Sequence, residues 1–257
     1  MSNKLTFLGT GTSTGVPQIG CQCDVCQSVD KRDKRTRCSS FIEYEGAKLL
    51  IDCGPDFRFQ AIENKVYHAD AVLFTHHHID HIGGTDDLRP LKDTDIYLNE
   101  LTEENVRRMY SYCFEEHPYP GVPKLTLHRI DYNPFTISYG EGKSKSLRIV
   151  PIKVMHGKCP IMGYRIGNLA YLTDISYLPE EEYDKLNGLD VLCLGCLRIE
   201  PHNTHQSFDE AMKMAERIGA KKTYFIHMSH HIGLHRDIEK MVPGNIEFAY
   251  DGLQIEF

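Results

Sequence analysis

Histidines and an aspartate are crowded into one short segment, THHHIDH, which follows the apolar run AVLF. His76 and His78 are two residues apart, so that at the end of a strand their side chains point to the same side. Asp80 and His81 come directly after them, whereas His77 points the other way and is not expected to be a ligand. Imidazole and carboxylate groups suit zinc, manganese or iron. The spacing therefore predicts metal binding at the end of this strand.

Later strands offer further ligands at their ends. The segment IVPIKVMH ends at His156, LAYLTD ends at Asp174 and TYFIH ends at His227. One short segment cannot complete two metal sites, but ligands at the ends of separate strands can meet at one rim of a sheet sandwich. A carboxylate such as that of Asp174 can bridge two cations. We therefore expect a binuclear centre, and these ligand types leave zinc, manganese and nickel open as its metals.

A second cluster of metal-binding side chains lies near the start of the chain. The segment GCQCDVCQS places Cys21, Cys23 and Cys26 close together with few apolar neighbours. Three such thiolates predict a zinc site, which needs a fourth ligand. The late segment HMSHHIGLH offers three candidates, which are His230, His231 and His235. By contrast, Cys193 and Cys196 in CLGC lie in a strongly apolar run, which favours buried free thiols.

Several basic residues are candidates for handling a substrate. His202 and His205 lie just before the segment SFDEAMKMAERIGA, and an imidazole near a metal-bound oxyanion can donate a proton to a leaving group. Arg58 and Arg89 lie close in sequence to the histidine cluster, and arginine binds phosphate with paired hydrogen bonds. We treat both arginines as candidates for substrate binding. Arg37 lies in the basic run DKRDKRTR, where it is part of a solvated loop face, ties loops together or faces a phosphate.

The elements that must position these residues follow from the apolar pattern. Helices are expected over 56–65, over 102–116 with a threonine cap, and over 207–220 with a serine cap and a glycine after the last turn. Strands are expected over 4–11, 40–46, 47–54, 69–75, 124–131, 135–140, 146–154, 162–167, 169–174, 189–199 and 221–228. The closing segment 246–257 is expected to form a hairpin. This order predicts two mostly antiparallel sheets that face each other, with helices outside.

Length, composition and charge limit the class of protein. The 257 residues, 41% hydrophobic and 25% charged, suit one globular domain over 1–257 with a cysteine loop near its start. No apolar run approaches the roughly 18 residues of a membrane helix, and the start has no signal-peptide pattern. We therefore expect a cytoplasmic protein without a membrane partner, whose nine cysteines are thiols or metal ligands. The net charge of −7 disfavours a binder of long nucleic acid but permits a small anionic substrate.

The motifs, taken in order, resemble those of metallo-β-lactamase-fold hydrolases over nearly the whole chain. The His-x-His-x-Asp-His box is followed by a later histidine, an aspartate and a final histidine. GTGTSTGVPQIGCQC, with its Cys-x-x-Cys and the late HMSH, resembles the PhnP-type cyclic phosphodiesterases. The resemblance implies an α/β protein with an αβ/βα four-layer sandwich. It also implies two ligand sets, one of His76, His78, His156 and Asp174 and the other of Asp80, His81, Asp174 and His227.

The same resemblance assigns further roles. It implies a structural zinc on the three cysteines and His230, with His231 as the alternative ligand. It matches His205 to a histidine that protonates the leaving group, and Asp52 to an aspartate that orients a ligand. Together with Asp80, His205 is expected to act in catalysis. The expected reaction is attack by a hydroxide held between the metals on a small cyclic phosphodiester, either a phosphoribosyl 1,2-cyclic phosphate or a 2′,3′-cyclic nucleotide.

Other functions of the same residues stay open. A tRNA 3′-processing nuclease shares the metal box, but it is expected to carry an added RNA-binding arm, which the sequence does not suggest. Thiolester or lactone hydrolysis is a further alternative, because Asp80 followed by His81 does not discriminate among these reactions. A metal-ordered binding protein without turnover is disfavoured by the complete ligand set. A homodimer is common in the fold family, but no pattern in the sequence predicts it.

Overall fold

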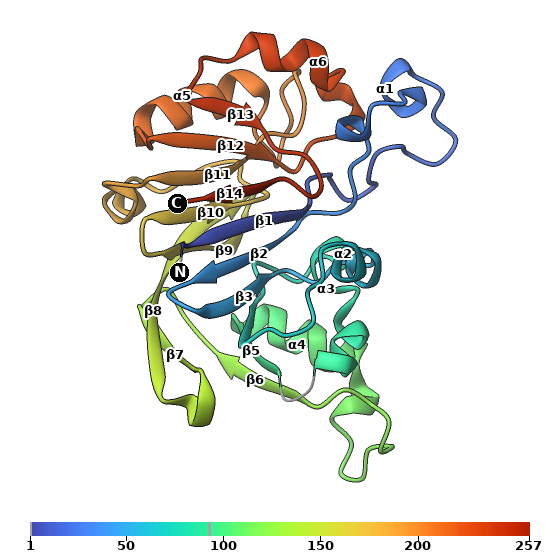
Figure 1. The fold of residues 1–257 in the computed structure, drawn as a ribbon, viewed down its shortest axis with the longest axis vertical. Coiled ribbons are helices and arrows are strands. Elements are labelled where there is room, and N and C mark those ends of the chain that lie inside the picture. Colours follow the sequence, from blue (N-terminus) through green and yellow to red (C-terminus); the bar gives the residue numbers. More distant parts are fainter. Residues whose placement is uncertain (1, 92–93) are drawn as a thin grey trace.

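Two seven-stranded sheets form the centre of the computed structural model, which describes residues 2–91 and 94–257 (Figure 1). The strands of the first sheet, in spatial order, are β14 (Gln254–Glu256), β1 (Lys4–Gly9), β2 (Ser39–Tyr44), β3 (Ala47–Ile51), β4 (Ala71–Leu73), β5 (Thr94–Leu98) and β6 (Leu125–Arg129). Those of the second are β13 (Ile246–Phe248), β12 (Lys222–Ile226), β11 (Val191–Gly195), β10 (Leu169–Leu172), β9 (Cys159–Ile166), β8 (Lys145–His156) and β7 (Phe135–Tyr139).

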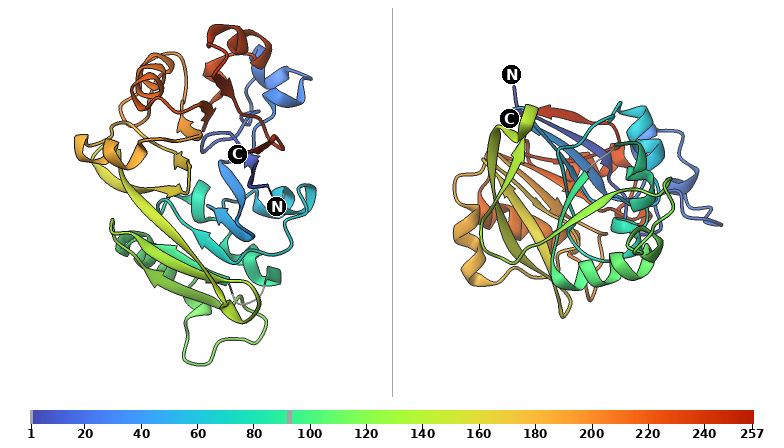
Figure 2. Two further views of the ribbon diagram at one scale, coloured as in Figure 1. Left: turned by 60° about the vertical axis from the view of Figure 1, so that its left-hand side comes forward. Right: turned by 90° about the horizontal axis from the view of Figure 1, so that it is seen from below.

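The two sheets pack face to face, and helices cover their outer faces. On β3, Leu49 and Ile51 join the core between the sheets, whereas Leu50 between them joins the core beneath the helices, as strand alternation requires. The α-helices are α1 (Asp24–Gln27), α2 (Phe57–Glu63), α3 (Ile79–Ile82), α4 (Glu100–Met109), α5 (Phe208–Ile218) and α6 (His235–Ile238). Helices α2 and α4 pack on the first sheet, and α5 and α6 on the second (Figures 1 and 2). The fold is therefore the expected αβ/βα sandwich.

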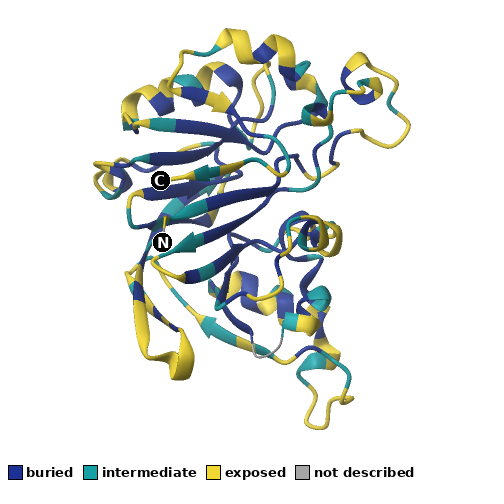
Figure 3. Ribbon diagram, viewed as in Figure 1, coloured by how far each residue is buried: buried dark blue, intermediate teal, exposed yellow. Residues whose placement is uncertain are grey.

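Short 3-10 helices complete the connections between these elements. They are η1 (Lys31–Asp33), η2 (Thr85–Leu91), η3 (Ser111–Cys113), η4 (Glu141–Lys143), η5 (Glu180–Leu186), η6 (His230–Ile232) and η7 (Glu239–Met241). Buried residues follow the strands and the inner faces of the helices, while exposed residues gather on the outer helices and the β7–β8 hairpin (Figure 3). No helix in the described part of the chain is long and apolar enough to cross a membrane.

Three expectations about the elements were wrong. The sheets are not mostly antiparallel, because β3 to β6 and β10 to β13 run parallel, joined by the helical crossovers that parallel strands require. The closing segment is not a hairpin, since β13 pairs with β12 in one sheet and β14 with β1 in the other. Helix α4 begins at Glu100, two residues earlier than expected, and ends at Met109. Its cap is Asn99, whose side chain accepts from the Thr102 N–H.

The strand ends converge on one edge of the sandwich. β4 and β10 lead into the segments of His76 and Asp174, β8 ends at His156, and β12 leads directly into His227. Parallel neighbours end at the same edge of a sheet, so β4 and β12 deliver their side chains to the rim where the two sheets meet. The first and last strands, β1 and β14, lie beside each other away from this rim, where Lys4 pairs with Glu256 (Figure 2).

Candidate metal centre and active site

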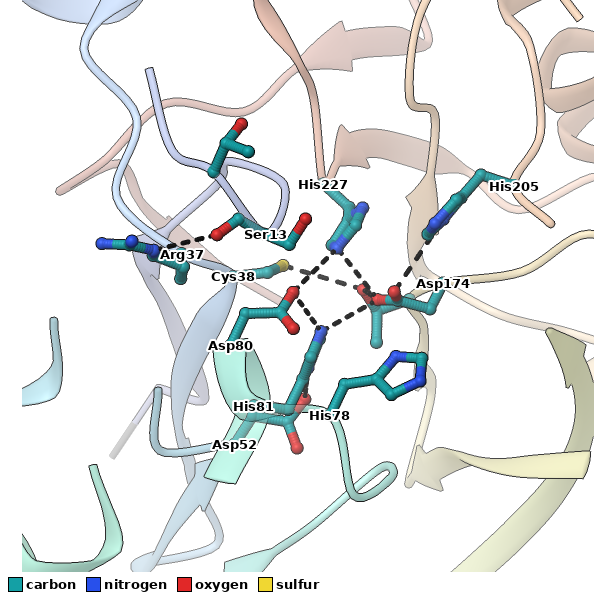
Figure 4. A network of polar contacts seen from close by, with 12 residues as sticks. Ser13, Arg37, Cys38, Asp52, His78, Asp80, His81, Asp174, His205 and His227 are labelled. Carbon is teal, nitrogen blue, oxygen red and sulfur yellow. Dashed lines mark hydrogen bonds and ion pairs between the residues drawn. The ribbon is translucent and has the colours of Figure 1, made fainter. Parts of the chain in front are cut away.

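One group of four side chains meets between the sheets. Asp80, His81, Asp174 and His227 offer ligand atoms that lie within 4.8 Å of one another, and Figure 4 shows them pointing toward a common centre. Nε2 of His81 lies 3.1 Å from Asp174 Oδ1 and 3.2 Å from Asp80 Oδ2, and Nε2 of His227 lies 3.1 Å from Asp174 Oδ1. All four residues are buried.

The position of the proton on His81 indicates that this group of four side chains is a cation site. Its Nδ1 lies 2.6 Å from Asp52 Oδ2 and donates a hydrogen bond there, so that in the neutral ring Nε2 is a bare lone pair. That lone pair points at two carboxylates, which are themselves acceptors. Nε2 of His81 and both ring nitrogens of His227 have no hydrogen-bond partner among the described residues. The His81 lone pair and the carboxylates of Asp80 and Asp174 are buried acceptors that face one another, and they fit a cation between them.

A second group lies beside the first and shares its aspartate. His76, His78, His156 and Asp174 also place their ligand atoms within 4.8 Å of one another. His76 Nε2 is 3.0 Å from His78 Nδ1 and 3.8 Å from Asp174 Oδ2. His156 Nδ1 donates to a backbone carbonyl 2.8 Å away, which again leaves Nε2 free to face the site. The structure thus brings together all seven predicted ligands, with Asp174 between the two groups.

The charge of Asp174 suits this bridging position. Burial alone opposes ionisation, but in their protonated forms the imidazoles of His227, His81 and His76 hold the pKa of its carboxyl well below the usual range. Thr173 adds a hydrogen bond of 2.8 Å from its hydroxyl to Asp174 Oδ1. The carboxylate is therefore ionised and oriented, as a metal ligand must be.

Local backbone geometry positions three of the site residues. Asp52, Asp174 and His227 have φ values of 60°, 50° and 62°, in the left-handed region that residues other than glycine rarely adopt. Each follows the end of a buried strand. Asp52 in turn accepts hydrogen bonds of 2.8 Å from the backbone N–H and from the hydroxyl of Thr75. Sequence reasoning missed Thr75 and Thr173, because a threonine beside a ligand carries no distinctive signal.

His205 lies at the mouth of the two groups. Its ring centroid is 4.6 Å from that of His156 and 5.0 Å from that of His227, and Nδ1 is 3.8 Å from Asp174 Oδ2. Burial and the neighbouring imidazoles, His227 first, lower the pKa of His205 to about 3. Figure 4 shows its ring directed at Asp174. The imidazole therefore faces the place where a group held by both ligand sets would lie.

The cysteine cluster forms a separate site on the N-terminal loop. Cys21, Cys23, Cys26 and His230 offer ligand atoms within 4.8 Å of one another. His230 Nδ1 is 3.4 Å from Cys21 Sγ and 3.2 Å from Cys23 Sγ, and the hydrogen bond from His230 lowers the pKa of Cys23 to about 6. His230, rather than His231, is the histidine placed with the cysteines. Three sulfurs and one imidazole fit a tetrahedral zinc site.

The remaining candidates lie in different surroundings. Arg89 is paired with Asp86. The guanidinium of Arg58 lies over the ring of Phe59, and Arg58 also lines a surface cavity between α2 and η2. The substrate-binding role of Arg58 and Arg89 stays a prediction. Arg37 ties loops together, since it donates to the Ser13 carbonyl (Figure 4) and also pairs with Asp56.

Two further cysteines behave as the sequence predicts. Cys193 and Cys196 are fully buried and free, and burial raises the pKa of both thiols.

Comparison with known proteins agrees with this geometry. Residues 47–228 match the family model of the β-lactamase superfamily domain. A crystal structure of a protein described as a new diphosphatase from the PhnP family has 40% identity and a TM-score of 0.90, with coverage of 100% of this chain and 98% of that one.

Two curated relatives are similar over part of their length. An octanoyltransferase of Porphyromonas gingivalis is 40% identical over 98% of this chain and 51% of its own length. A ribonuclease Z of Methanopyrus kandleri is 45% identical over 63% of this chain and 49% of its own length. The chain therefore spans about half the length of these two relatives.

Proposed function

This chain belongs to the β-lactamase superfamily as a PhnP-type protein, and we propose that it is a metal-dependent phosphodiesterase acting on a small cyclic phosphodiester. Substrates of this class are phosphoribosyl 1,2-cyclic phosphate and 2′,3′-cyclic nucleotides. The proposal rests on one observation. The two ligand sets share Asp174, and the ring of His205 lies beside that carboxylate. A cytoplasmic location is part of the proposal and rests on the sequence.

The ligand sets fit two divalent cations, zinc or manganese among them, and the cysteine site fits a structural zinc. His76, His78, His156 and Asp174 would hold one active-site cation, and Asp80, His81, Asp174 and His227 the other. When bound, such cations lower the pKa of water and neutralise charge that develops on phosphoryl oxygens. The two sets share one carboxylate, which suits a substrate group that contacts both cations at once.

His205 supplies the proton for the leaving oxygen. Its ring lies between His156 and His227, one from each ligand set, so it faces any phosphoryl group that spans both. Burial, and then the charges of the neighbouring imidazoles with His227 first, lower the pKa of His205. An anionic phosphodiester beside the ring raises that pKa again, so protonation of His205 accompanies substrate binding.

Turnover of a substrate panel tests the proposal. Protein loaded with manganese or zinc is mixed with the cyclic diesters, with a linear diester, with an octanoyl thiolester and with a lactone, and products are followed by phosphorus NMR and chromatography. We expect a cyclic diester to be opened, and the His205→Ala variant to lose about 10²- to 10⁴-fold in kcat at unchanged metal content. The exposed His68 lies at the opposite end of β4, so His68→Ala is the matched control and keeps full activity.

Other outcomes contradict the proposal. Hydrolysis of the thiolester or lactone, without turnover of any phosphate ester, means an acyl hydrolase, a candidate favoured by the relative named octanoyltransferase. Cleavage of a tRNA precursor in preference to every small diester means a nuclease, as the ribonuclease Z relative would suggest.

A further inference from the structure

A tight turn just after β1 lies beside the ligand sets, and the proposed reaction does not yet use it. The carbonyl of Thr12 accepts a hydrogen bond of 2.8 Å from the Gly15 N–H, which makes Ser13 one of the two central residues of a four-residue turn. The Thr12 N–H in turn donates to the Met228 carbonyl at 3.0 Å. Because Met228 directly follows the ligand His227, the turn is held next to one member of the ligand sets.

Ser13 directs its two oxygen atoms to opposite sides. Its carbonyl accepts from Nε of Arg37 at 3.1 Å, whereas its hydroxyl points away from Arg37, toward His227 and the ligand sets (Figure 4). Ser13 is exposed, and its carbonyl makes the one hydrogen bond that it has within residues 2–91 and 94–257. A serine hydroxyl carries one donor. Ser13 therefore offers an unused donor to the site, and His205 lies on the other side of His227 in the same view.

Arg37 fixes the orientation of this turn. One terminal nitrogen of Arg37 pairs with Asp56 Oδ1 at 3.0 Å, and the backbone N–H of Arg37 donates to Asp56 Oδ2 at 2.9 Å. The guanidinium is thereby anchored while its Nε holds the Ser13 carbonyl. Arg37 also packs beside the metal-ligand segment, since a Cβ at Gly54 would lie 2.1 Å from the Asp80 carbonyl oxygen and 3.5 Å from Cβ of Arg37. One side chain thus connects the turn to the start of α2.

We propose that the Ser13 hydroxyl donates a hydrogen bond to one non-bridging oxygen of the phosphoryl group at the ligand sets, and that Arg37 positions Ser13 by holding its carbonyl. The inference rests on the proposed function, which places a phosphodiester between the ligand sets and His205. Attack of water on that group places negative charge on the non-bridging oxygens, and a donor that is fixed in advance stabilises this charge. Because Ser13 and His205 lie on opposite sides of His227, Ser13 contacts a phosphoryl oxygen and His205 the leaving oxygen.

Sulfur substitution of the substrate tests this contact. The cyclic diester that wild type opens is compared with its two phosphorothioate diastereomers, each with sulfur in place of one non-bridging oxygen. For the oxygen substrate, we expect Ser13→Ala to lose roughly 10- to 100-fold in kcat/KM, the loss expected for a hydrogen bond to a charged group. For one diastereomer, the oxygen-to-sulfur rate ratio falls by a similar factor, because the variant has no hydrogen bond left for the sulfur to weaken. The ratio for the other diastereomer stays as in wild type.

Further variants separate the contact from folding. Ser13→Thr keeps the hydroxyl and restores both the rate and the sulfur ratios. Thr14→Ala is the matched control in the same turn, because the Thr14 hydroxyl donates to the Gly15 carbonyl at 3.4 Å, and it keeps every rate. Arg37→Lys retains a cation but does not hold Ser13 and Asp56 together, so it changes the same sulfur ratio in the same direction as Ser13→Ala. Metal content and Tm of the serine variants match those of wild type.

Binding of inorganic phosphate gives a readout other than turnover. Calorimetric titration of the metal-loaded protein shows about tenfold weaker phosphate binding in Ser13→Ala than in wild type, and unchanged binding in Thr14→Ala. Equal losses for all three substrates in Ser13→Ala, or rates equal to those of wild type, overturn the contact and leave the phosphodiesterase standing. Failure of wild type to open any cyclic diester overturns the proposed function, and the inference about Ser13 with it.

Discussion

The proton on each site imidazole is fixed by a group outside the ligand sets. Asp52 accepts from Nδ1 of His81, and the Thr204 carbonyl accepts from Nδ1 of His156, so both rings turn a bare Nε2 inward. These partners decide whether an imidazole is a ligand or a donor. Asp52 and Thr204, which are not members of the ligand sets, are therefore expected to control metal affinity.

Replacing Asp52 by Asn tests this control. The carboxamide places an N–H₂ group or an oxygen opposite His81 Nδ1, and it cannot accept from both His81 and Thr75 as the carboxylate does. We expect a roughly 10- to 100-fold loss in affinity for one active-site metal, measured by competition with a chelator. Asp70→Asn is the matched control, because Asp70 also accepts from a backbone N–H and a histidine, at the other end of β4. Metal affinity of Asp52→Asn within twofold of wild type would contradict this role.

The sequence predicts ligands far better than their supports. The spacing of His76, His78, Asp80 and His81 reports ligand chemistry directly, because four such side chains on one segment have few other uses. The support for His156 comes from a backbone carbonyl, which any residue at position 204 would supply. The left-handed backbone at Asp174 is likewise set by the strands around it, and the residue type does not predict it.

At the scale of elements, the segment after β12 links the two predicted metal sites. His227 belongs to the active-site set and His230 to the cysteine set, with only two residues between them. Met228 in this segment exchanges backbone hydrogen bonds with Thr10 and Thr12, so the segment is attached to the N-terminal loop. The cysteine site therefore fixes the loop that lies beside His227.

Loss of a thiolate tests the cysteine site. Cys23→Ser is expected to bind one zinc fewer per chain, by metal analysis, and to lose roughly 3 kcal/mol in the free energy of unfolding, because the loop has little apolar core of its own. His231→Ala, at the neighbouring histidine, should keep both the zinc and the stability. If His231→Ala released the zinc and Cys23→Ser did not, the assignment of ligands would be wrong.

Elements with strong local signals could be predicted, and those set by distant pairing could not. Ser207, Glu210 and Gly219 form the capping box and the left-handed end of α5, all within the helix itself. The Glu45–Gly46 turn, which joins β2 to β3, is likewise set by residues within the turn itself. The segment 246–257 has the pattern of a hairpin, but β14 lies beside the distant β1, a pairing that no local pattern contains.

At the scale of the whole molecule, a buried ionic network joins the start of the chain to its end. Arg35 is fully buried and donates to Thr10 Oγ1, to the Ala249 carbonyl and to Nδ1 of His235. Asp251 accepts from Thr10 nearby. Because these residues lie on both terminal segments, the network closes the sandwich around the N-terminal loop.

The network predicts how stability depends on pH. Burial, and then the charges of Arg35 and Arg32, lower the pKa of His235 from 6.5 to about 4. The unfolded chain therefore binds a proton more readily, so stability is lost as the pH falls from about 6.5 toward 4. We expect a loss on the order of 1–2 kcal/mol from this group over that range of pH.

The variant His235→Asn isolates this effect. Its amide oxygen still accepts from Arg35 but does not titrate. Between pH 7 and pH 4.5, its Tm should fall less than that of wild type, as followed by circular dichroism. Parallel Tm curves for the two proteins would show that His235 does not drive the acid sensitivity.

Product analysis in heavy-oxygen water tests whether water attacks phosphorus at the two ligand sets that share Asp174 beside His205. The metal-loaded enzyme opens a cyclic diester in that water, and phosphorus NMR locates the label through its isotope shift. We expect one labelled oxygen on the phosphorus of the monoester product. Label on the sugar carbon, or no phosphate turnover with both metals bound, would contradict it.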